Sequence, residues 1–290
     1  MPKKFHEIIT KMILQSKEQF VKYVPTAVAS AWEDLITYVE ASERWLRTEV
    51  LGNVLYLEIH DTPGKHGDLL DTCMKIISLD AYRRAIPFLD LVQNANGFAV
   101  VCSDNLAPAS RDRVNRLIEA TIKERDEEIE VLISYLEDTT SYHDAWKGSK
   151  AFSVLSDCLI TTAKELKLLC NWYGTRTDFL KLKPDLLLRS YTDIGKWIGR
   201  EYIDELVEQQ RDGDLTSDNK TVINFLKVVL ANFVVGDPVN ANRSLEDVIT
   251  FLDKNVSKYP TYGNSVEYKV RHAEKFENST GNPFFILGGI

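Results

Sequence analysis

The chain has 290 residues, of which 44% are hydrophobic and 27% are charged. This composition is typical of a water-soluble globular protein, with enough apolar side chains for one large core or two of moderate size. The formal net charge of −8 argues against a protein that grips nucleic acid through its phosphates, because that requires clustered lysine and arginine. No apolar run approaches the roughly 20 residues of a membrane-spanning helix, so we expect neither a span nor a signal peptide.

Apolar residues at helical spacing predict a series of helices in the first half. The stretch Ala31–Leu51 predicts an amphipathic helix closed by Gly52. A loop is expected over His60–Gly67, followed by a broadly apolar helix over Leu69–Phe88. Pro87 should end or kink that helix, because its ring removes a hydrogen-bond donor and crowds the preceding turn.

Gly97–Cys102, with the sequence GFAVVC, is a β-branched apolar run between two turns and predicts a strand. The longest helix is expected over Ser110–Glu137, with a charged face that is most simply exposed to solvent. Residues 139–150 are polar and predict the boundary between the two halves. The second half is again helical through about Val256, and from Gly263 the chain reads as an extended tail.

A faint internal repeat relates the halves at a shift of about 147 residues. This shift aligns Leu35 with Leu182 and Gly52 with Gly199, among a few other identities. The order of elements also recurs: a helix ending on an apolar residue and glycine, then a further turn, a polar loop and a second apolar helix, the latter at Leu69–Phe88 and Thr221–Phe233. A third helix should begin at a capping serine in each half, at Ser110 and at Ser244.

Motifs that carry chemistry are few. The sequence has no phosphate-binding P-loop, nucleophile elbow, HExxH pair or GxGxxG fingerprint. Two His-Asp doublets, His60-Asp61 and His143-Asp144, leave a helical metal-dependent phosphohydrolase as an alternative, although a metal site needs more ligands converging from several helices. The cysteines form no CxxC pair and predict reduced, buried thiols in a cytosolic protein; they are Cys73, Cys102, Cys158 and Cys170. We therefore predict no catalytic, cofactor-binding or metal-binding residues and no enzymatic activity.

The run AYRRAIPFLDLVQNANGFAVVCSDNLAPASRDRVNRLI, Ala81–Ile118, resembles a family of uncharacterised proteins encoded by Bacteroidetes prophages and phages. The segment PFFILGGI, Pro283–Ile290, is similar to the C-terminus of that family. The resemblance implies a virion structural protein, and the helical pattern is similar to the head-tail connectors, which form portal-bound adaptor rings, commonly of twelve copies. It implies as partners the portal protein, the tail-side neck proteins and further copies of the chain.

Together these observations predict an all-α protein of two tandem connector-like modules, residues 1–140 and 141–262, with one or two short strands and an extended tail over 263–290. The apolar tail residues Phe284, Phe285, Ile286 and Leu287 could add a strand to a neighbouring protein, with Phe98, Val100 and Val101 as one acceptor strand, or could fold back onto their own chain. DNA would be passing cargo only, repelled by the acidic balance. The expected location is the head-tail junction of a virion made in the bacterial cytoplasm, and a non-virion prophage binding protein is a further alternative.

Overall fold

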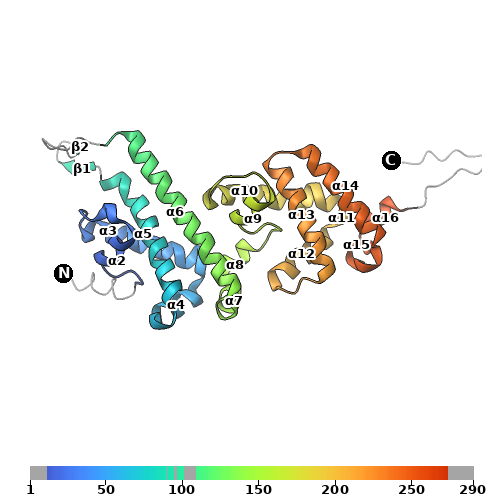
Figure 1. The fold of residues 1–290 in the computed structure, drawn as a ribbon, viewed down its shortest axis with the longest axis horizontal. Helices are drawn as coiled ribbons and strands as arrows, with labels where there is room; N and C mark the ends of the chain where they lie inside the picture. The colour runs from blue at the N-terminus through green and yellow to red at the C-terminus, as the bar shows by residue number, and fades with distance from the viewer. Residues whose placement is uncertain (1–11, 90, 95–96, 101–108, 274–290) are drawn as a thin grey trace, which may run out of the picture. The chain divides into compact units, whose positions relative to one another are not determined.

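The computed structural model describes residues 12–89, 91–94, 97–100 and 109–273 (Figure 1). The chain divides into two compact units, the first made of residues 1–157 and 161–182 and the second of residues 158–160 and 183–290. The described part is all-α, as predicted, apart from one short hairpin. Within the described ranges, no helix combines the length and the apolar character needed to cross a membrane.

In the first unit, α5 (Gly67–Leu89) is the central helix and packs against both α3 (Trp32–Leu46) and α6 (Arg111–Asp138) (Figure 1). Ile76 and Ile77 are fully buried on adjacent faces of α5, as a helix in contact with several others requires. Pro87 lies near the end of α5, which stops at Leu89. The described residues of this unit also form α2 (Lys17–Tyr23), α4 (Asn53–Asp61), α7 (Thr140–Lys147), α8 (Lys150–Leu155), α9 (Ala163–Leu169) and the start of α10 (Arg176–Arg189), with 3-10 turns at Pro25–Ala27 and Pro63–Lys65.

The strands β1 (Leu91–Asn94) and β2 (Gly97–Val100) pair in antiparallel orientation as a short hairpin. Phe98 lies opposite Gln93, and Val100 lies opposite Leu91. The strand expected over 97–102 coincides with β2 for its first four residues, and its last two lie outside the described residues.

The second unit is built around the packing of α13 (Ser217–Val235) against α14 (Pro238–Lys254). Leu226 and Leu230, one helical turn apart on α13, are fully buried in this unit, and so is Leu252 on α14. The surrounding elements are the end of α10, α11 (Lys196–Ile198), α12 (Arg200–Asp212), α15 (Pro260–Asn264), α16 (Val266–Arg271) and a 3-10 turn at Val256–Lys258.

Two predicted boundaries differ from the structure. The polar stretch 139–150 is α7 and the start of α8, and the two units divide near Leu182 instead. Buried apolar residues explain this. Trp146, within the polar stretch, and Phe152, in α8, both belong to the core of the first unit. The predicted extended tail is likewise wrong for its first residues, since α16 is helical, while residues 274–290 lie outside the described ranges.

The predicted capping serines also differ from the structure. Ser110 does precede α6 in extended conformation, but its side chain makes no capping hydrogen bond. Ser244 lies inside α14, which begins at Pro238 with the Asp237 side chain accepting from the Asn240 N–H. An Asp-Pro pair at the start of a helix combines a capping oxygen with a preset φ, and Asp237-Pro238 therefore starts α14 upstream of Ser244.

The same junction occurs once in each unit and includes the aligned pair Gly52 and Gly199. In the first unit, α3 continues as a π-helical segment, Arg47–Leu51, that ends at Gly52 with a φ of +78°. In the second, α10 continues as a π-helical segment, Ser190–Gly195, followed by α11 and by Gly199 with a φ of +93°. The next helix starts directly after each glycine.

A serine packs against each of these glycines. Ser149, which caps α8, lies against Gly52, and Ser265, which caps α16, lies against Gly199. A β-carbon at either glycine would collide with the β-carbon of its serine. The carbonyl two residues before each glycine also accepts a side-chain N–H, from Trp146 at Val50 (2.7 Å) and from Arg271 at Trp197. Both junctions thus use glycine for its backbone angles and for its lack of a side chain.

We expect Gly52→Ala and Gly199→Ala each to lower the free energy of unfolding by about 2–4 kcal/mol, because strain at a positive φ adds to the serine collision. Gly213→Ala is the matched control, since Gly213 has a φ of +78° but no atom near its missing β-carbon. It should cost about 1 kcal/mol. Chemical denaturation of the three variants provides the comparison. Equal losses in all three would show that the serine contact contributes nothing.

A buried carboxylate holds the first described residues to the core. Glu43, only 3% exposed on α3, accepts the backbone N–H of Ile13 and the hydroxyl of Tyr56 (2.6 Å) through Oε1. Its Oε2 is buried and has no hydrogen-bonding partner among the described residues. Burial raises the pKa of Glu43 to about 7, although the two donors and the nearby His60 act in the opposite direction. The charged form is therefore disfavoured in the folded state.

The contribution of Glu43 to stability should consequently fall as the pH rises toward and through 7. The folded pKa of Glu43 lies above the unfolded value, so its contribution is complete below pH 4.5 and is lost as the pH passes about 7. The variant Glu43→Gln mimics the protonated form. By chemical denaturation we expect its free energy of unfolding to be similar to that of the wild type at pH 5 but higher at pH 8, by about 1–3 kcal/mol. The same difference in free energy of unfolding between variant and wild type at both pH values would contradict the raised pKa of Glu43.

Candidate functional site

Two carboxylates on α6 bind the first turns of two later helices. Asp126 accepts the backbone N–H of Thr177 at the start of α10 (2.6 Å), and Glu130 accepts that of Lys164 at the start of α9 (3.0 Å). The two carboxylates are one helical turn apart, so they project from the same face of α6. Each satisfies a backbone donor that its helix leaves free and lies at the positive end of the helix dipole.

A network of buried ion pairs lies behind these carboxylates. Asp80 on α5 has a side chain with no exposed surface and contacts Arg83, Arg84 and Arg125 at 2.7, 2.6 and 2.7 Å. Burial raises the pKa of Asp80, but the three guanidinium groups more than reverse this and hold it below its usual range. Arg125 also binds Asp126 at 2.6 Å, which joins α5 and α6 to the bonds made with α10.

Arg125 is the residue on which this network converges. Besides both aspartates, its guanidinium donates to the Thr177 hydroxyl (2.8 Å) and lies over the Trp45 ring at 5.3 Å. Its side chain is only 7% exposed. The sequence predicts a solvent-exposed charged face for this helix, and at Arg125 and Asp126 that prediction is wrong, because each charge has its partner within the fold.

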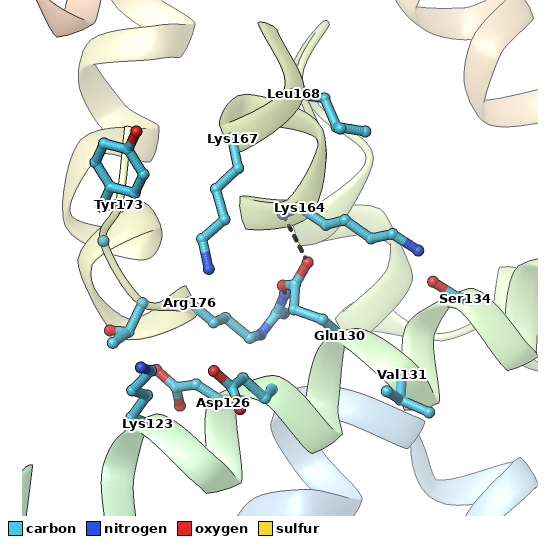
Figure 2. A pocket seen from close by; sticks show the side chains of 13 residues that line it. Lys123, Asp126, Glu130, Val131, Ser134, Lys164, Lys167, Leu168, Tyr173 and Arg176 are labelled. Carbon is cyan, nitrogen blue, oxygen red and sulfur yellow. Dashed lines mark hydrogen bonds and ion pairs between the residues drawn. The ribbon is translucent and has the colours of Figure 1, made fainter. Parts of the chain in front are cut away.

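A pocket of about 710 Å³ lies in the first unit between α6 and the segment formed by α9, the following loop and the start of α10 (Figure 2). Asp126, Glu130 and Arg176 form its polar inner wall, where Arg176 binds Glu130 at 3.1 Å. The pocket is lined further by Lys123, Glu127, Val131, Ser134, Lys164, Lys167, Leu168, Tyr173, Gly174 and Thr175. Its volume lies within the range of ligand-binding pockets.

The charges of this pocket fall into two groups. Asp126 and Glu130 are neutralised by arginines and by backbone N–H groups. Lys123, Lys164 and Lys167 have side chains with no ion-pair partner in the described part of the chain. In Figure 2 the Lys167 side chain extends from α9 toward Arg176, while the Lys164 side chain points toward Ser134. The available charge of the pocket is therefore mostly positive.

Of the interaction residues predicted from the sequence, two lie on the hairpin. Phe98 and Val100 belong to β2, whose one edge pairs with β1 and whose other edge has no strand partner among the described residues. Val101 and the tail residues Phe284, Phe285, Ile286 and Leu287 lie outside the described ranges.

The two His-Asp doublets are not brought together into a ligand set. His60 binds Asp61 at 2.8 Å and stacks on Tyr56, while His143 on α7 packs edge-on against Phe152. In the described part of the chain, no group of three or more histidine, cysteine, aspartate or glutamate side chains is placed to hold a metal ion. Cys73 is fully buried, and burial raises the pKa of its thiol to about 12.

Replacing Arg125 with methionine should destabilise the first unit by about 3–5 kcal/mol, because the buried Asp126 would lose its charged partner. Arg189→Met is a matched control, since Arg189 is a partly exposed arginine with helical ion pairs to Asp185 and Asp193. It should cost less than about 1 kcal/mol. Urea denaturation followed by circular dichroism measures both, and similar losses would mean that the network contributes no more than a surface ion pair.

Comparison with known proteins identifies one relationship. No curated protein and no solved structure matches the chain. A family model described as a family of unknown function, DUF6712, matches residues 33–154 and 239–272, which together exceed half of the chain. The first range covers α3 to α8 with the Gly52 junction, and the second covers most of α14 together with α15 and α16. The chain therefore belongs to the DUF6712 family, whose function is unknown.

Proposed function

We propose that this protein is a structural subunit of a tailed phage or prophage particle, namely a head-tail connector that assembles as a ring on the portal. The observation that carries the proposal is the recurrence of one helical junction in both units, with Gly52 against Ser149 and Gly199 against Ser265. Such a recurrence supports two related modules in one subunit. The resemblance of Ala81–Ile118 to phage-encoded proteins supports the class of particle.

Apolar side chains are exposed around both junctions. Val54, close to Gly52, is 69% exposed, and Val154, in α8, is 53% exposed. Trp197, Val266 and Val270, at the second junction, are 42%, 70% and 70% exposed. Apolar side chains gathered at one place on a surface commonly mark contacts with other proteins. A ring subunit needs two different lateral faces, because head-to-tail contacts generate a closed ring, and two diverged copies of one junction would supply them.

The other parts of the proposal follow from the sequence. The segment Pro283–Ile290 would reach a neighbouring subunit or the portal, where it could add a strand to an exposed edge such as that of β2. DNA would pass without being held, because the net charge of −8 repels phosphates.

Assembly of the purified protein tests the lateral faces. We expect closed rings by light scattering and electron microscopy, and we expect Val266→Asp with Val270→Asp to give folded monomers, because two charges would be buried in the contact. Val239→Asp is the control, since Val239 at the start of α14 is also 70% exposed but lies outside the junction.

Particles purified from a host that carries the phage test the location. Mass spectrometry should find the protein at a ring-like copy number relative to the portal. Its absence from intact particles would overturn the connector proposal and would favour a binding protein that stays outside the virion.

A further inference from the structure

We propose that the pocket between α6 and α9–α10 docks a segment of a partner protein in which carboxylates flank a bulky apolar side chain. This inference does not rest on the connector proposal, because it concerns one pocket of the first unit and applies to any assembly.

The charge of the pocket selects an acidic ligand. The inner carboxylates of Asp126 and Glu130 already have cationic and backbone partners, so they offer little to a ligand. The ammonium groups of Lys123, Lys164 and Lys167 are free of carboxylate partners in the described ranges. Glu127 is the one lining carboxylate that is exposed, and the three lysines outnumber it. Carboxylates of a ligand would therefore gain partners at the mouth of the pocket.

Apolar side chains at the same pocket are left exposed. Leu168 is 81% exposed, Tyr173 is 88% exposed and Val131 is 57% exposed, and all three line it. They come from α9, from the following loop and from α6, so they surround the pocket from different sides. A bulky apolar side chain entering the pocket would cover them, which is how an anchor residue contributes to a protein interface.

The loop that carries Tyr173 is held in place before any ligand binds. The Trp172 N–H donates to the Cys170 carbonyl at 2.8 Å. The Trp172 ring lies so close to Gly174 that a β-carbon there would collide with it. Thr175 and Asp178 then bind each other through the Thr175 N–H (3.1 Å) and hydroxyl (3.0 Å) at the start of α10. A loop that is already ordered loses less conformational entropy when a ligand binds.

A peptide fits these observations better than a membrane or a nucleic acid does. The site is a concave pocket with helical walls, whereas a bilayer contacts protruding surfaces. Nucleic acid binding needs a continuous basic track along the phosphates, and here the exposed Glu127 lines the same pocket as the lysines. A carboxylate-bearing peptide carries lower charge density and can place an apolar side chain between its acidic groups.

An arrayed library of short random peptides tests the proposal with the full-length protein. We expect the selected peptides to combine glutamate or aspartate with leucine, phenylalanine or tryptophan. Fluorescence polarisation of the best labelled peptide should show at least about tenfold weaker binding to the variant Lys164→Glu with Lys167→Glu, because two attractive contacts become repulsive. Binding should also weaken as salt is added.

Three controls separate this site from general charge effects. Lys65→Glu changes an exposed lysine that does not line the pocket, and it should bind the peptide as the wild type does. Tyr173→Ala should weaken binding without a change in melting temperature, because the Tyr173 ring is exposed. The same peptide with glutamines in place of its acidic residues should bind at least about tenfold more weakly.

Several results would overturn the proposal. These are selection of uncharged or basic peptides, absence of any selected peptide, and equal binding by the lysine variant. Lysine-dependent binding to phosphatidylserine vesicles without peptide binding would assign the site to a membrane, and displacement of the peptide by oligothymidylate would assign it to nucleic acid. Peptide-independent self-association that the lysine variant abolishes would assign it to a second copy of the chain.

Discussion

The fold depends on a backbone constraint that only glycine satisfies. At Gly52 and again at Gly199, a helix that has widened into a π-helical segment must turn sharply into the next helix while a capping serine approaches the turn. The positive φ excludes most other residues, and the serine excludes any side chain. The helix before each glycine, the helix after it and a later helix capped by the serine, α8 or α16, meet at this one point. The carbonyl of Val50, in the first π-helical segment, and that of Trp197, in α11 after the second, accept side-chain N–H groups from later helices.

A different principle organises the long helix α6. Its buried face carries charges as well as apolar residues, and these charges are tolerated because each is paired with a charge or with a backbone N–H. Arg125 and Asp126 connect α5, α6 and α10, while Glu130 one turn later connects α6 to α9. The side chains of the inner wall of the pocket, Asp126, Glu130 and Arg176, are therefore engaged in contacts within the fold. The outer lysines of the pocket and its exposed apolar residues, together with the single exposed carboxylate of Glu127, remain available for a ligand.

Much of the fold could be predicted from the helical spacing of apolar residues and from the residues that end helices. The apolar spacing of Leu35 and Val39 and that of Cys73, Ile77 and Ala81 predict the central helices, and Gly52 marks the end of one of them. The linker over 139–150 could not be read correctly, because the burial of Trp146 depends on a distant carbonyl at Val50. The charged face of α6 was equally ambiguous. Nothing in the local pattern around Arg125 shows that Asp80, on another helix, is its partner. The pocket residues were missed for the same reason, since they come from segments that are far apart in the sequence.

The contacts that hold α9 to α6 have a further consequence for how this surface can diversify. Glu130 accepts the backbone N–H of Lys164, so this hydrogen bond can form with any residue at position 164 except proline. The side chains on one wall can then be exchanged without releasing the segment that presents them. The family match covers the α6 wall but not α9 or the start of α10. The proposed docking surface would thus tolerate substitution of the Lys164 side chain without the loss of the backbone contact that positions α9.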